Sequence, residues 1–342
     1  MQKAARPRYV PFMKPDLLDL LQCPACHAPG PFSLIDPQAD PYEIVAGQIV
    51  CAACSAAFPV RHGYCDLLHN PSEPVRGELA AQREIERRGS TPDPAAAAPS
   101  ILRLPDGNPD AEEHAPLVRY AVSALCPNGN ETVLDLGAGL GWTSAMFARA
   151  GCRCVLVDIY STVLEAGRCF AQNGAYFDRL LADMSRLPLR PGAFDAVFAN
   201  AAVHHTPDLD ATLREAARVL KPGGRLMFVN EPVVGRWETR RPAEFGADYR
   251  KDGICERAYT TGQWHHAFRQ AGLDPDFKIL DVGFDEKIRR RAAMPAYARF
   301  PCKQALALLR NSSARRCVLK LLAPIALELY PFNVILTTQK PQ

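Results

Sequence analysis

The chain has 342 residues, a net charge of +3 and 12 cysteines. This length allows one large and one small domain, and so small a charge does not by itself imply a polyanionic partner. The basic N-terminal residues are not followed by an apolar run, and no stretch reaches about 18 uninterrupted apolar residues, so we expect neither a secretory signal nor a transmembrane helix. Cysteines inside strand-like runs, such as Cys152 and Cys154, indicate buried thiols rather than a disulfide framework. Together these features predict a cytoplasmic protein.

Two C-x-x-C pairs lie near the N-terminus, at Cys23 and Cys26 and at Cys51 and Cys54. Each pair places two thiolates for one metal ion, and two pairs complete a closed tetrahedral zinc site. Such a site leaves no position open for water, so we expect the Zn²⁺ to be structural. A module of roughly 50 residues with few large apolar side chains needs this support. We therefore predict a small zinc-binding domain over residues 16–70.

The next stretch, residues 71–115, is polar and then rich in alanine and proline, and we expect a linker with one charged helix near Glu78–Arg88. Residues 116–342 alternate short apolar segments with helical patterns, which predicts an α/β domain with a doubly wound, seven-stranded, mainly parallel sheet. The expected strands are Thr132–Leu136, Arg153–Asp158, Leu180–Asp183, Ala193–Asn200, Gly224–Asn230, Phe277–Val282 and Asn333–Thr338. The expected helices between them include Trp142–Ala150, Ser161–Asn173 and Leu209–Leu220.

The first expected strand of this domain ends in a glycine-rich loop that begins at Asp135 and contains Gly137, Gly139 and Gly141. Ligands bind at the carboxyl edge of parallel sheets, and glycines let a ligand approach the backbone. The third glycine comes one residue too early for a dinucleotide-binding loop. Asp135 would repel a pyrophosphate, whereas it suits a cofactor that carries an ammonium and a sulfonium group.

Acidic residues also stand at the ends of the next two strands. Asp158, followed by Ile159, can accept hydrogen bonds from both hydroxyls of a ribose. Asp183, followed by Met184, is placed to accept a hydrogen bond from an adenine amino group.

Together with the segments Phe194–Asn200 and Val219–Gly224, these motifs resemble the class I S-adenosylmethionine-dependent methyltransferases of type 11, over about residues 116–282. The resemblance implies a Rossmann-like fold whose last strand is antiparallel, and S-adenosyl-L-methionine as cofactor. It also implies that Asp135 and the loop backbone hold the methionine part, Asp158 the ribose, and Asp183 with Met184 the adenine. The expected cofactor-binding residues are Asp135, Gly137, Ala138, Gly139, Gly141, Trp142, Asp158, Ile159, Asp183, Met184 and Asn200.

The segment from Leu20 through both cysteine pairs to Leu68 resembles the zinc-ribbon modules of the methyltransferase-activator family. Those modules act alone as partners of methyltransferases or are fused to them. The resemblance thus implies a zinc ribbon in front of a methyltransferase domain.

Three further residues are candidates for the acceptor side of the site. Methyl transfer from a sulfonium needs mainly proximity and orientation, and it needs a base only where the acceptor must lose a proton. His204 and His205 follow the fourth strand, and either could be that base; alternatively they shape the loop. Glu231 ends the fifth strand, where it could contact the acceptor or be a solvated strand end.

We expect a small-molecule acceptor, such as a sugar-containing or phosphorylated metabolite. An RNA methyltransferase is an alternative, because the basic stretch Lys287–Lys320, within a helical insertion at about residues 285–330, could bind RNA. The same stretch could instead bind an anionic membrane surface or a phosphorylated substrate, or be a solvated helix face over the sheet edge. Asn200-Ala-Ala-Val stands where an N/D-P-P-Y/F motif would indicate methylation of base amino groups. A second alternative is a non-catalytic module that binds the cofactor and recruits a partner.

Overall fold

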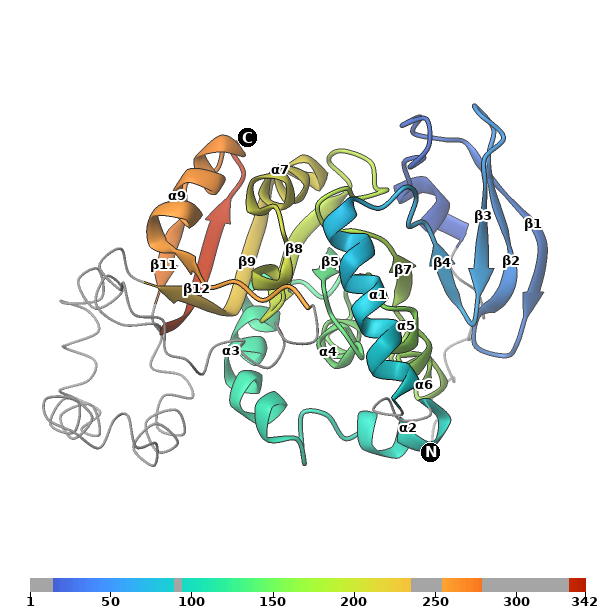
Figure 1. Ribbon diagram of the computed structural model, residues 1–342, viewed down its shortest axis with the longest axis horizontal. Coiled ribbons are helices and arrows are strands. Elements are labelled where there is room, and N and C mark those ends of the chain that lie inside the picture. Colours follow the sequence, from blue (N-terminus) through green and yellow to red (C-terminus); the bar gives the residue numbers. More distant parts are fainter. Residues whose placement is uncertain (1–14, 89–93, 235–253, 279–331) are drawn as a thin grey trace, which may run out of the picture.

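The structure is a computed structural model, and it describes residues 15–88, 94–234, 254–278 and 332–342. Its strands form one sheet in the order β1-β2-β3-β4-β7-β6-β5-β8-β9-β12-β11, with β10 beside β9 (Figure 1). The strands are β1 (Phe32–Ala39), β2 (Ile44–Cys51), β3 (Ala57–Arg61), β4 (Tyr64–Asp66), β5 (Thr132–Leu136), β6 (Arg153–Asp158), β7 (Asp178–Leu181), β8 (Phe194–Asn200), β9 (Leu220–Val234), β10 (Tyr259–Thr260), β11 (Asp276–Lys278) and β12 (Phe332–Gln339). The helices are α1 (Glu73–Arg87), α2 (Pro94–Ile101), α3 (Pro109–Leu125), α4 (Trp142–Arg149), α5 (Ser161–Ala166), α6 (Arg168–Gln172), α7 (Leu209–Val219) and α9 (Thr261–Gln270), with short 3₁₀ helices η1 (Pro15–Leu20) and η2 (Val203–His205).

The centre of the sheet is the predicted doubly wound domain. Strands β7, β6, β5, β8 and β9 are parallel, and β12 pairs with β9 in the antiparallel direction, as expected for the last strand. Successive strand residues pack into different cores: Leu134 lies in the core shared with α7 and α9, whereas Val133 lies in the core shared with α3 and α4. Because helices cover both faces, apolar side chains of these strands are buried on both sides of the sheet.

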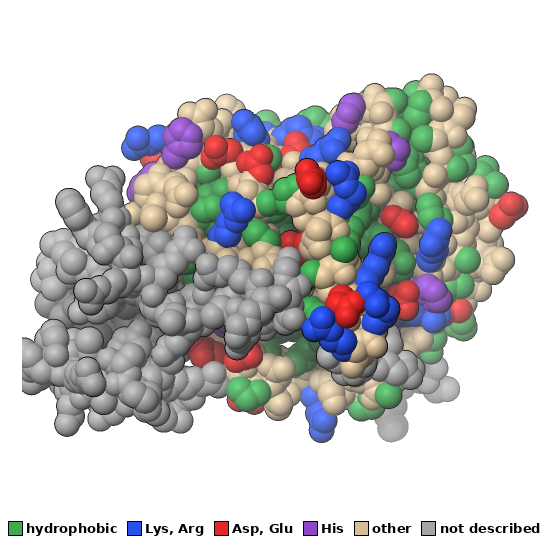
Figure 2. Space-filling view, in the orientation of Figure 1, with side chains coloured by type: hydrophobic (Ala, Val, Ile, Leu, Met, Phe, Trp, Pro, Cys, Tyr) green, Lys and Arg blue, Asp and Glu red, His purple; other side chains and the backbone are tan. Residues whose placement is uncertain are grey.

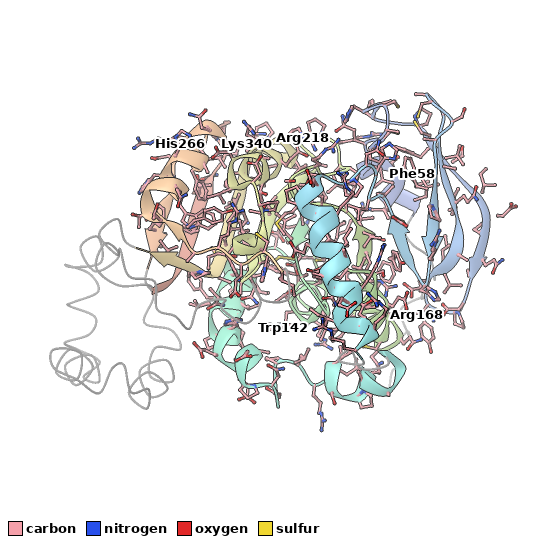
Figure 3. All side chains as sticks on the ribbon, in the orientation of Figure 1. Phe58, Trp142, Arg168, Arg218, His266 and Lys340 are labelled. Atoms are coloured by element: carbon pink, nitrogen blue, oxygen red, sulfur yellow. A yellow bond between two sulfur atoms is a disulfide. The ribbon has the colours of Figure 1, made fainter. Side chains whose placement is uncertain are left out.

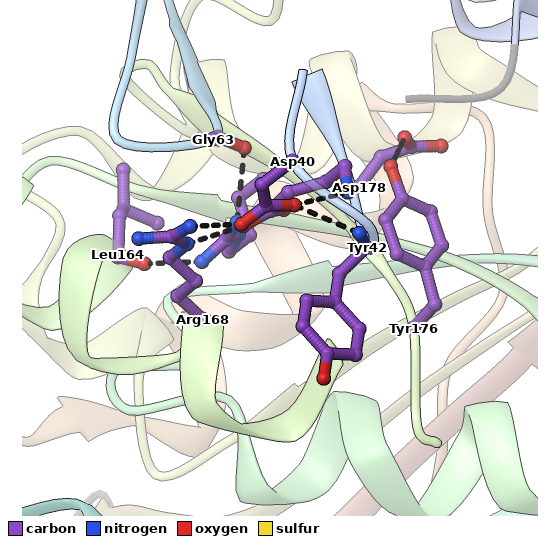
Figure 4. Close-up of polar contacts among 9 residues, drawn as sticks. Asp40, Tyr42, Gly63, Leu164, Arg168, Tyr176 and Asp178 are labelled. Atoms are coloured by element: carbon purple, nitrogen blue, oxygen red, sulfur yellow. Dashed lines mark hydrogen bonds and ion pairs between the residues drawn. The ribbon is translucent and has the colours of Figure 1, made fainter. Parts of the chain in front are cut away.

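The cysteine-bearing strands β1 to β4 join this sheet edge to edge. Strand β4 pairs in parallel with β7, placing Cys65 beside Leu180. A buried ion pair between Glu43 and Arg179 crosses the junction, and Arg168 of α6 donates to Glu43 at 3.1 Å and also pairs with Asp40 (Figure 4). The sequence predicted a small domain here without any indication that its strands would extend the neighbouring sheet.

The stretch expected to be a linker is largely helical. The charged helix predicted near Glu78–Arg88 is present as α1, which runs across the front of the molecule between the zinc-module strands and the centre of the sheet (Figure 1). Helix α2 and the start of α3 follow within the same stretch. The Ala/Pro composition indicated a flexible chain, but alanine is a strong helix former and proline is tolerated in the first turn, as at Pro94.

Several smaller expectations need correction. Cys152 forms a disulfide with Cys126 and is not a thiol, because folding brings the end of α3 beside the start of β6. The helix expected at 161–173 is interrupted at Gly167, where the carbonyl oxygen of Leu140 would lie 3.3 Å from a Cβ atom. Strand β7 ends two residues before Asp183, so that Asp183 lies in the following loop. The basic insertion at about 285–330 lies outside the described residues.

In the portions of the chain that the structure describes, no helix combines the length and the apolar character needed to cross a membrane.

Candidate active site

The carboxyl ends of the parallel strands gather the predicted cofactor residues at one edge of the sheet. Asp135 lies near the end of β5 and is completely buried. Its Oδ2 atom accepts hydrogen bonds from the hydroxyls of Thr143 and Ser144 on α4, both at 2.7 Å. Its Oδ1 atom has no hydrogen-bond partner among the described residues. Burial raises the pKa of Asp135 to about 7, although the two hydroxyls oppose this shift.

The three glycines of the loop all have positive φ angles, but they serve different purposes. A Cβ atom at Gly137 would lie 2.7 Å from the Cβ of Ala202, and one at Gly141 would lie 2.7 Å from the Phe177 ring. These two glycines allow close packing of the loop. At Gly139, by contrast, a Cβ would meet no atom within 4 Å, so open space borders the backbone there. Ala138 and Trp142, the other predicted loop residues, are half-buried.

Asp158 ties the second strand to this loop. Its Oδ2 accepts the N–H of Gly139 at 3.0 Å, and its Oδ1 accepts the N–H of Tyr160 at 3.0 Å. Burial raises the pKa of Asp158 to about 6, against the effect of these N–H groups. Ile159, which lies between Asp158 and Tyr160 in the sequence, is half-buried. The carboxylate therefore lies beside the open space at Gly139.

Asp183 has the same character as Asp135, with one occupied and one free oxygen. Its Oδ1 accepts the N–H and the hydroxyl of Ser185 at 2.8 and 2.7 Å. Its Oδ2 is buried and finds no partner in the described part of the chain. The adjacent Met184 side chain reaches the glycine loop, since its Cε would lie 3.3 Å from a Cβ at Gly137.

The fourth and fifth strands hold a turn that carries the two histidines. Asn200, at the end of β8, accepts a hydrogen bond from the amide of Asn230 at 2.7 Å. Glu231 is completely buried, and its carboxylate accepts the N–H groups of residues 202, 203 and 204 at 2.9 to 3.0 Å. It also accepts Nδ1–H of His204 at 3.0 Å. Burial raises the pKa of Glu231, but these contacts outweigh burial and the net pKa is lowered. The structure thus places Glu231 beneath the turn, not as a solvated strand end.

His205 is held differently from His204. Its Nδ1 atom lies 2.7 Å from the carbonyl oxygen of Cys255, so Nδ1 carries the proton and donates it. Burial and the nearby His204, whose ring centroid lies 4.2 Å away, lower the pKa of His205 to about 4. The ring is therefore neutral at physiological pH, with its proton on Nδ1 and a lone pair on Nε2.

One buried acid near this edge was not singled out from the sequence. Glu78 of α1 is 5% exposed, and its Oε1 accepts the hydroxyl of Tyr160 at 2.7 Å. In the sequence, Glu78 lies among other charged residues within a stretch that was predicted to be a linker. Its position three residues after the apolar Val75, which is also buried, was the available indication that it faces inward.

The four predicted zinc ligands come together at one end of β2 and the turn after η1. Sγ of Cys23 lies 3.7 Å from that of Cys54, and Sγ of Cys26 lies 3.8 Å from that of Cys51. All four sulfur atoms lie within 4.8 Å of one another. Tetrahedral zinc with bonds of about 2.3 Å separates its sulfur ligands by about 3.8 Å. The cysteines therefore fit a closed zinc site.

Two protein families match separate parts of this chain. The family described as Methyltransferase domain matches residues 134–228, and the family described as Trm112p-like protein matches residues 14–63. Methyltransferase GfsG of Streptomyces halstedii is 32% identical over 199 residues, which cover 56% of this chain and 69% of that protein. The ubiquinone/menaquinone biosynthesis C-methyltransferase UbiE of Pectobacterium atrosepticum is 31% identical over 180 residues, covering 49% and 71%. Among solved structures, the complex of the Haloferax volcanii Trm112 methyltransferase activator with a methyltransferase matches with a TM-score of 0.46 and 19% identity, over 72% of this chain and 96% of that one.

Proposed function

Because this chain belongs to the S-adenosylmethionine-dependent methyltransferases, we propose that it methylates a small molecule that carries a hydroxyl group, with His205 accepting the proton that this hydroxyl loses. Its N-terminal module is Trm112-like, and its four clustered cysteines fit a structural zinc site. The observation that carries the proposal is the contact of His205 Nδ1 with the Cys255 carbonyl at 2.7 Å, which leaves the unprotonated Nε2 on a turn at the cofactor edge of the sheet.

The cofactor fits the residues at this edge. The free Oδ1 of Asp135 is a buried acceptor suited to the ammonium group of the methionine part. Asp158, beside the open space at Gly139, would accept the ribose hydroxyls, and the free Oδ2 of Asp183 would accept the adenine amino group. Half-buried Met184 and Trp142 would supply apolar walls. When bound, S-adenosylmethionine supplies an electrophilic methyl group on a positively charged sulfur.

The electrostatics of the site favour a cation. Asp135 and Asp158 both have raised pKa values because they are buried, with no arginine or lysine paired to either among the described residues. A positively charged ligand stabilises the ionised form of each carboxylate. The same interactions hold the ligand in one orientation, which is the main requirement of a displacement reaction.

His205 would then act on the acceptor. A hydroxyl oxygen that gains a methyl group becomes a strong acid, so a base with a pKa of about 4 is sufficient to take its proton. The Nδ1–H bond to the Cys255 carbonyl keeps Nε2 unprotonated until that moment. Glu231 and His204 would position the turn and would not touch the acceptor, since Glu231 is fully buried and its oxygens are occupied.

The test is methyl transfer from S-adenosylmethionine labelled with tritium in its methyl group. We would offer phenols, hydroquinones and sugars as acceptors, with total RNA as a separate arm. UbiE, a relative, is named as a C-methyltransferase of ubiquinone and menaquinone biosynthesis, so products are analysed for both O- and C-methylation.

We expect label in a small molecule and a loss of about 100-fold in kcat for His205→Gln. The matched control is His266→Gln, because His266 lies at the outer surface of α9 with its side chain 64% exposed (Figure 3). Label that enters only RNA, or an unchanged kcat for His205→Gln, would reject the proposal.

A further inference from the structure

The Cys126–Cys152 disulfide lies at the edge of the sheet opposite the cofactor residues. Cys126 follows α3, and Cys152 comes directly before β6. Glu131 comes directly before β5, and its Oε2 atom lies 3.9 Å from Sγ of Cys152. One possible ligand atom from each of the three side chains lies within 4.8 Å of the other two. Two sulfur atoms and a carboxylate oxygen at this spacing are potential metal ligands that neither the cysteine cluster of the N-terminal module nor the cofactor site uses.

Glu131 differs from the acidic residues at the surface. Figure 2 shows exposed Asp and Glu side chains beside Lys and Arg on one face of the molecule. Glu131, in contrast, is only 6% exposed. Its Oε1 accepts the backbone N–H and the side-chain amide of Asn128 at 3.0 and 2.9 Å, and its Oε2 accepts the N–H of Asn130 at 3.1 Å. These donors fix the carboxylate in one orientation and leave Oε2, which contacts Cys152, able to bind a further partner.

The two turns that carry these side chains are held together by their backbones as well as by the disulfide. A Cβ atom at Gly129 would lie 2.9 Å from the carbonyl oxygen of Ala150, and one at Gly151 would lie 2.5 Å from the carbonyl oxygen of Gly129. The strands that follow continue this contact, since the N–H of Arg153 donates to the carbonyl of Glu131 at 2.9 Å. The turns would therefore keep the two cysteines close to each other if the disulfide were reduced.

The spacing of the two cysteines suits a disulfide and also a shared metal ion. Their Cα atoms are 6.6 Å apart, which is near the upper end of the range of about 4.4–6.8 Å for disulfides. Tetrahedral zinc separates its sulfur ligands by about 3.8 Å. Because the Cα atoms are already far apart, rotation about the Cα–Cβ bonds can bring the reduced sulfur atoms to that separation.

We propose that Cys126, Cys152 and Glu131 bind a second Zn²⁺ ion when their disulfide is reduced. Two molecules of a low-molecular-weight thiol such as glutathione convert the disulfide into two cysteine thiols and are themselves joined as a disulfide. Zn²⁺ then binds the two thiolates, and their two protons are released. Conditions that keep the four cysteines of the N-terminal module reduced also favour this state.

The second ion would be bound differently from the first. Three protein ligands leave the fourth tetrahedral position to water, whereas the four cysteines of the N-terminal module form a closed set. Pro127 and Asn128, next to partly buried Cys126, are exposed, so that water can reach this side of the cluster. We therefore expect the second ion to exchange more readily than the first.

The experiment counts zinc in the full-length protein in two redox states. One sample would be reduced with excess glutathione under nitrogen, and the other kept as the disulfide. Both would be dialysed against the same Zn²⁺ solution without thiol, and zinc per chain measured by plasma mass spectrometry. Mass spectrometry of alkylated peptides would identify the reduced cysteines. We expect the reduced protein to hold one more Zn²⁺ per chain than the disulfide form and than the reduced double variant Cys126→Ala/Cys152→Ala. This difference does not depend on how fully the N-terminal site is occupied.

Two further variants separate the carboxylate from the thiols. Glu131→Gln keeps an oxygen for the Asn128 donors but removes the charge, and we expect about tenfold weaker binding of the second ion. The matched control is Cys154→Ala, because Cys154 is a buried free thiol two residues from Cys152 that does not belong to the cluster. We expect this control to bind as much zinc as the wild type, and urea denaturation would confirm that each variant is folded.

Three results would overturn the proposal. The reduced wild type could hold no more zinc than the double variant, or the additional ion could persist in the double variant. The pair could also remain a disulfide in the folded protein under excess glutathione. None of these measurements involves methyl transfer, so their outcome is independent of the proposed function.

Discussion

The cofactor loop and the histidine turn lie on the same edge of the sheet, and each is built around a completely buried carboxylate. Asp135 in the loop has one free oxygen and a pKa raised to about 7. Glu231 under the turn accepts three N–H groups and an imidazole, and its pKa is lowered. Both carboxylates are completely buried, so the number of hydrogen-bond donors decides the difference between their pKa values.

The contrast separates two uses of a buried charge. A carboxylate whose oxygens are all occupied stabilises the protein that surrounds it, whereas one with a free oxygen costs stability until a ligand supplies a donor. Asp183, with its free Oδ2, belongs with Asp135 in this respect. We therefore expect substitutions in the two regions to change the free energy of unfolding in opposite directions.

The largest effect is expected for Glu231→Ala. This change leaves three buried N–H groups and the His204 ring without an acceptor, and we expect a loss of about 3 kcal/mol in the free energy of unfolding. Urea denaturation measures it, with Glu231→Gln as the milder comparison that keeps one acceptor oxygen. A loss below about 1 kcal/mol for the alanine variant would show that the turn does not depend on this carboxylate.

Asp135→Asn is expected to raise the free energy of unfolding, whereas Glu231→Ala lowers it. The pKa of Asp135 is raised in the folded protein, so its contribution to stability is present at low pH and is lost as the pH rises through 7. Removing the charge should stabilise the cofactor-free protein at pH 8 by about 2 kcal/mol, after the cost of the new amide N–H₂, and much less at pH 4.5. Thermal and urea unfolding at both pH values would detect this, and a destabilised variant at pH 8 would contradict it.

The same carboxylates should make cofactor binding depend on pH. Asp135 and Asp158, with pKa values of about 7 and 6, are largely protonated at pH 5.5 and ionised at pH 8. Because the cofactor requires both ionised forms, we expect its Kd to be about 100-fold higher at pH 5.5. Calorimetry at the two pH values tests this, and a Kd independent of pH would mean that neither acid binds the ligand.

The smallest effect on stability is expected for Gly139→Ala. Its φ of +53° costs about 1 kcal/mol for a residue with a Cβ, but there is space for that atom. The added methyl would occupy the open region beside Asp158, so cofactor affinity should fall far more than stability does. Gly141→Ala is the counterpart, because its Cβ would meet Phe177 and disturb the packing itself.

Local patterns were sufficient to predict the parallel strands and the residues at their ends. Asp135, Asp158 and Asp183 could be predicted to lie near one another because each stands at or just after the end of a short apolar strand, and parallel strands end at the same edge of a sheet. The zinc ligands could be found because two C-x-x-C pairs form a closed set. These inferences need only spacing within one segment and a general rule for the fold.

The remaining features depend on contacts between distant segments. Glu78 meets Tyr160 across 82 positions, and Glu43 meets Arg179 across 136. No local pattern specifies such pairs. The buried role of Glu231 and the Cys126–Cys152 disulfide were missed for the same reason, since each depends on which loops fold against each other.

The most direct test of the central claim is calorimetric titration of S-adenosylmethionine into the wild type, Asp183→Asn and Asp195→Asn. Asp195 is the control because it stands near the amino end of β8, where it accepts the N–H of Thr132 and pairs with Lys221. We expect one cofactor per chain, about tenfold weaker binding for Asp183→Asn, and unchanged binding for Asp195→Asn. No binding by the wild type, or equal affinity for Asp183→Asn, would contradict the assignment of this edge as the cofactor site.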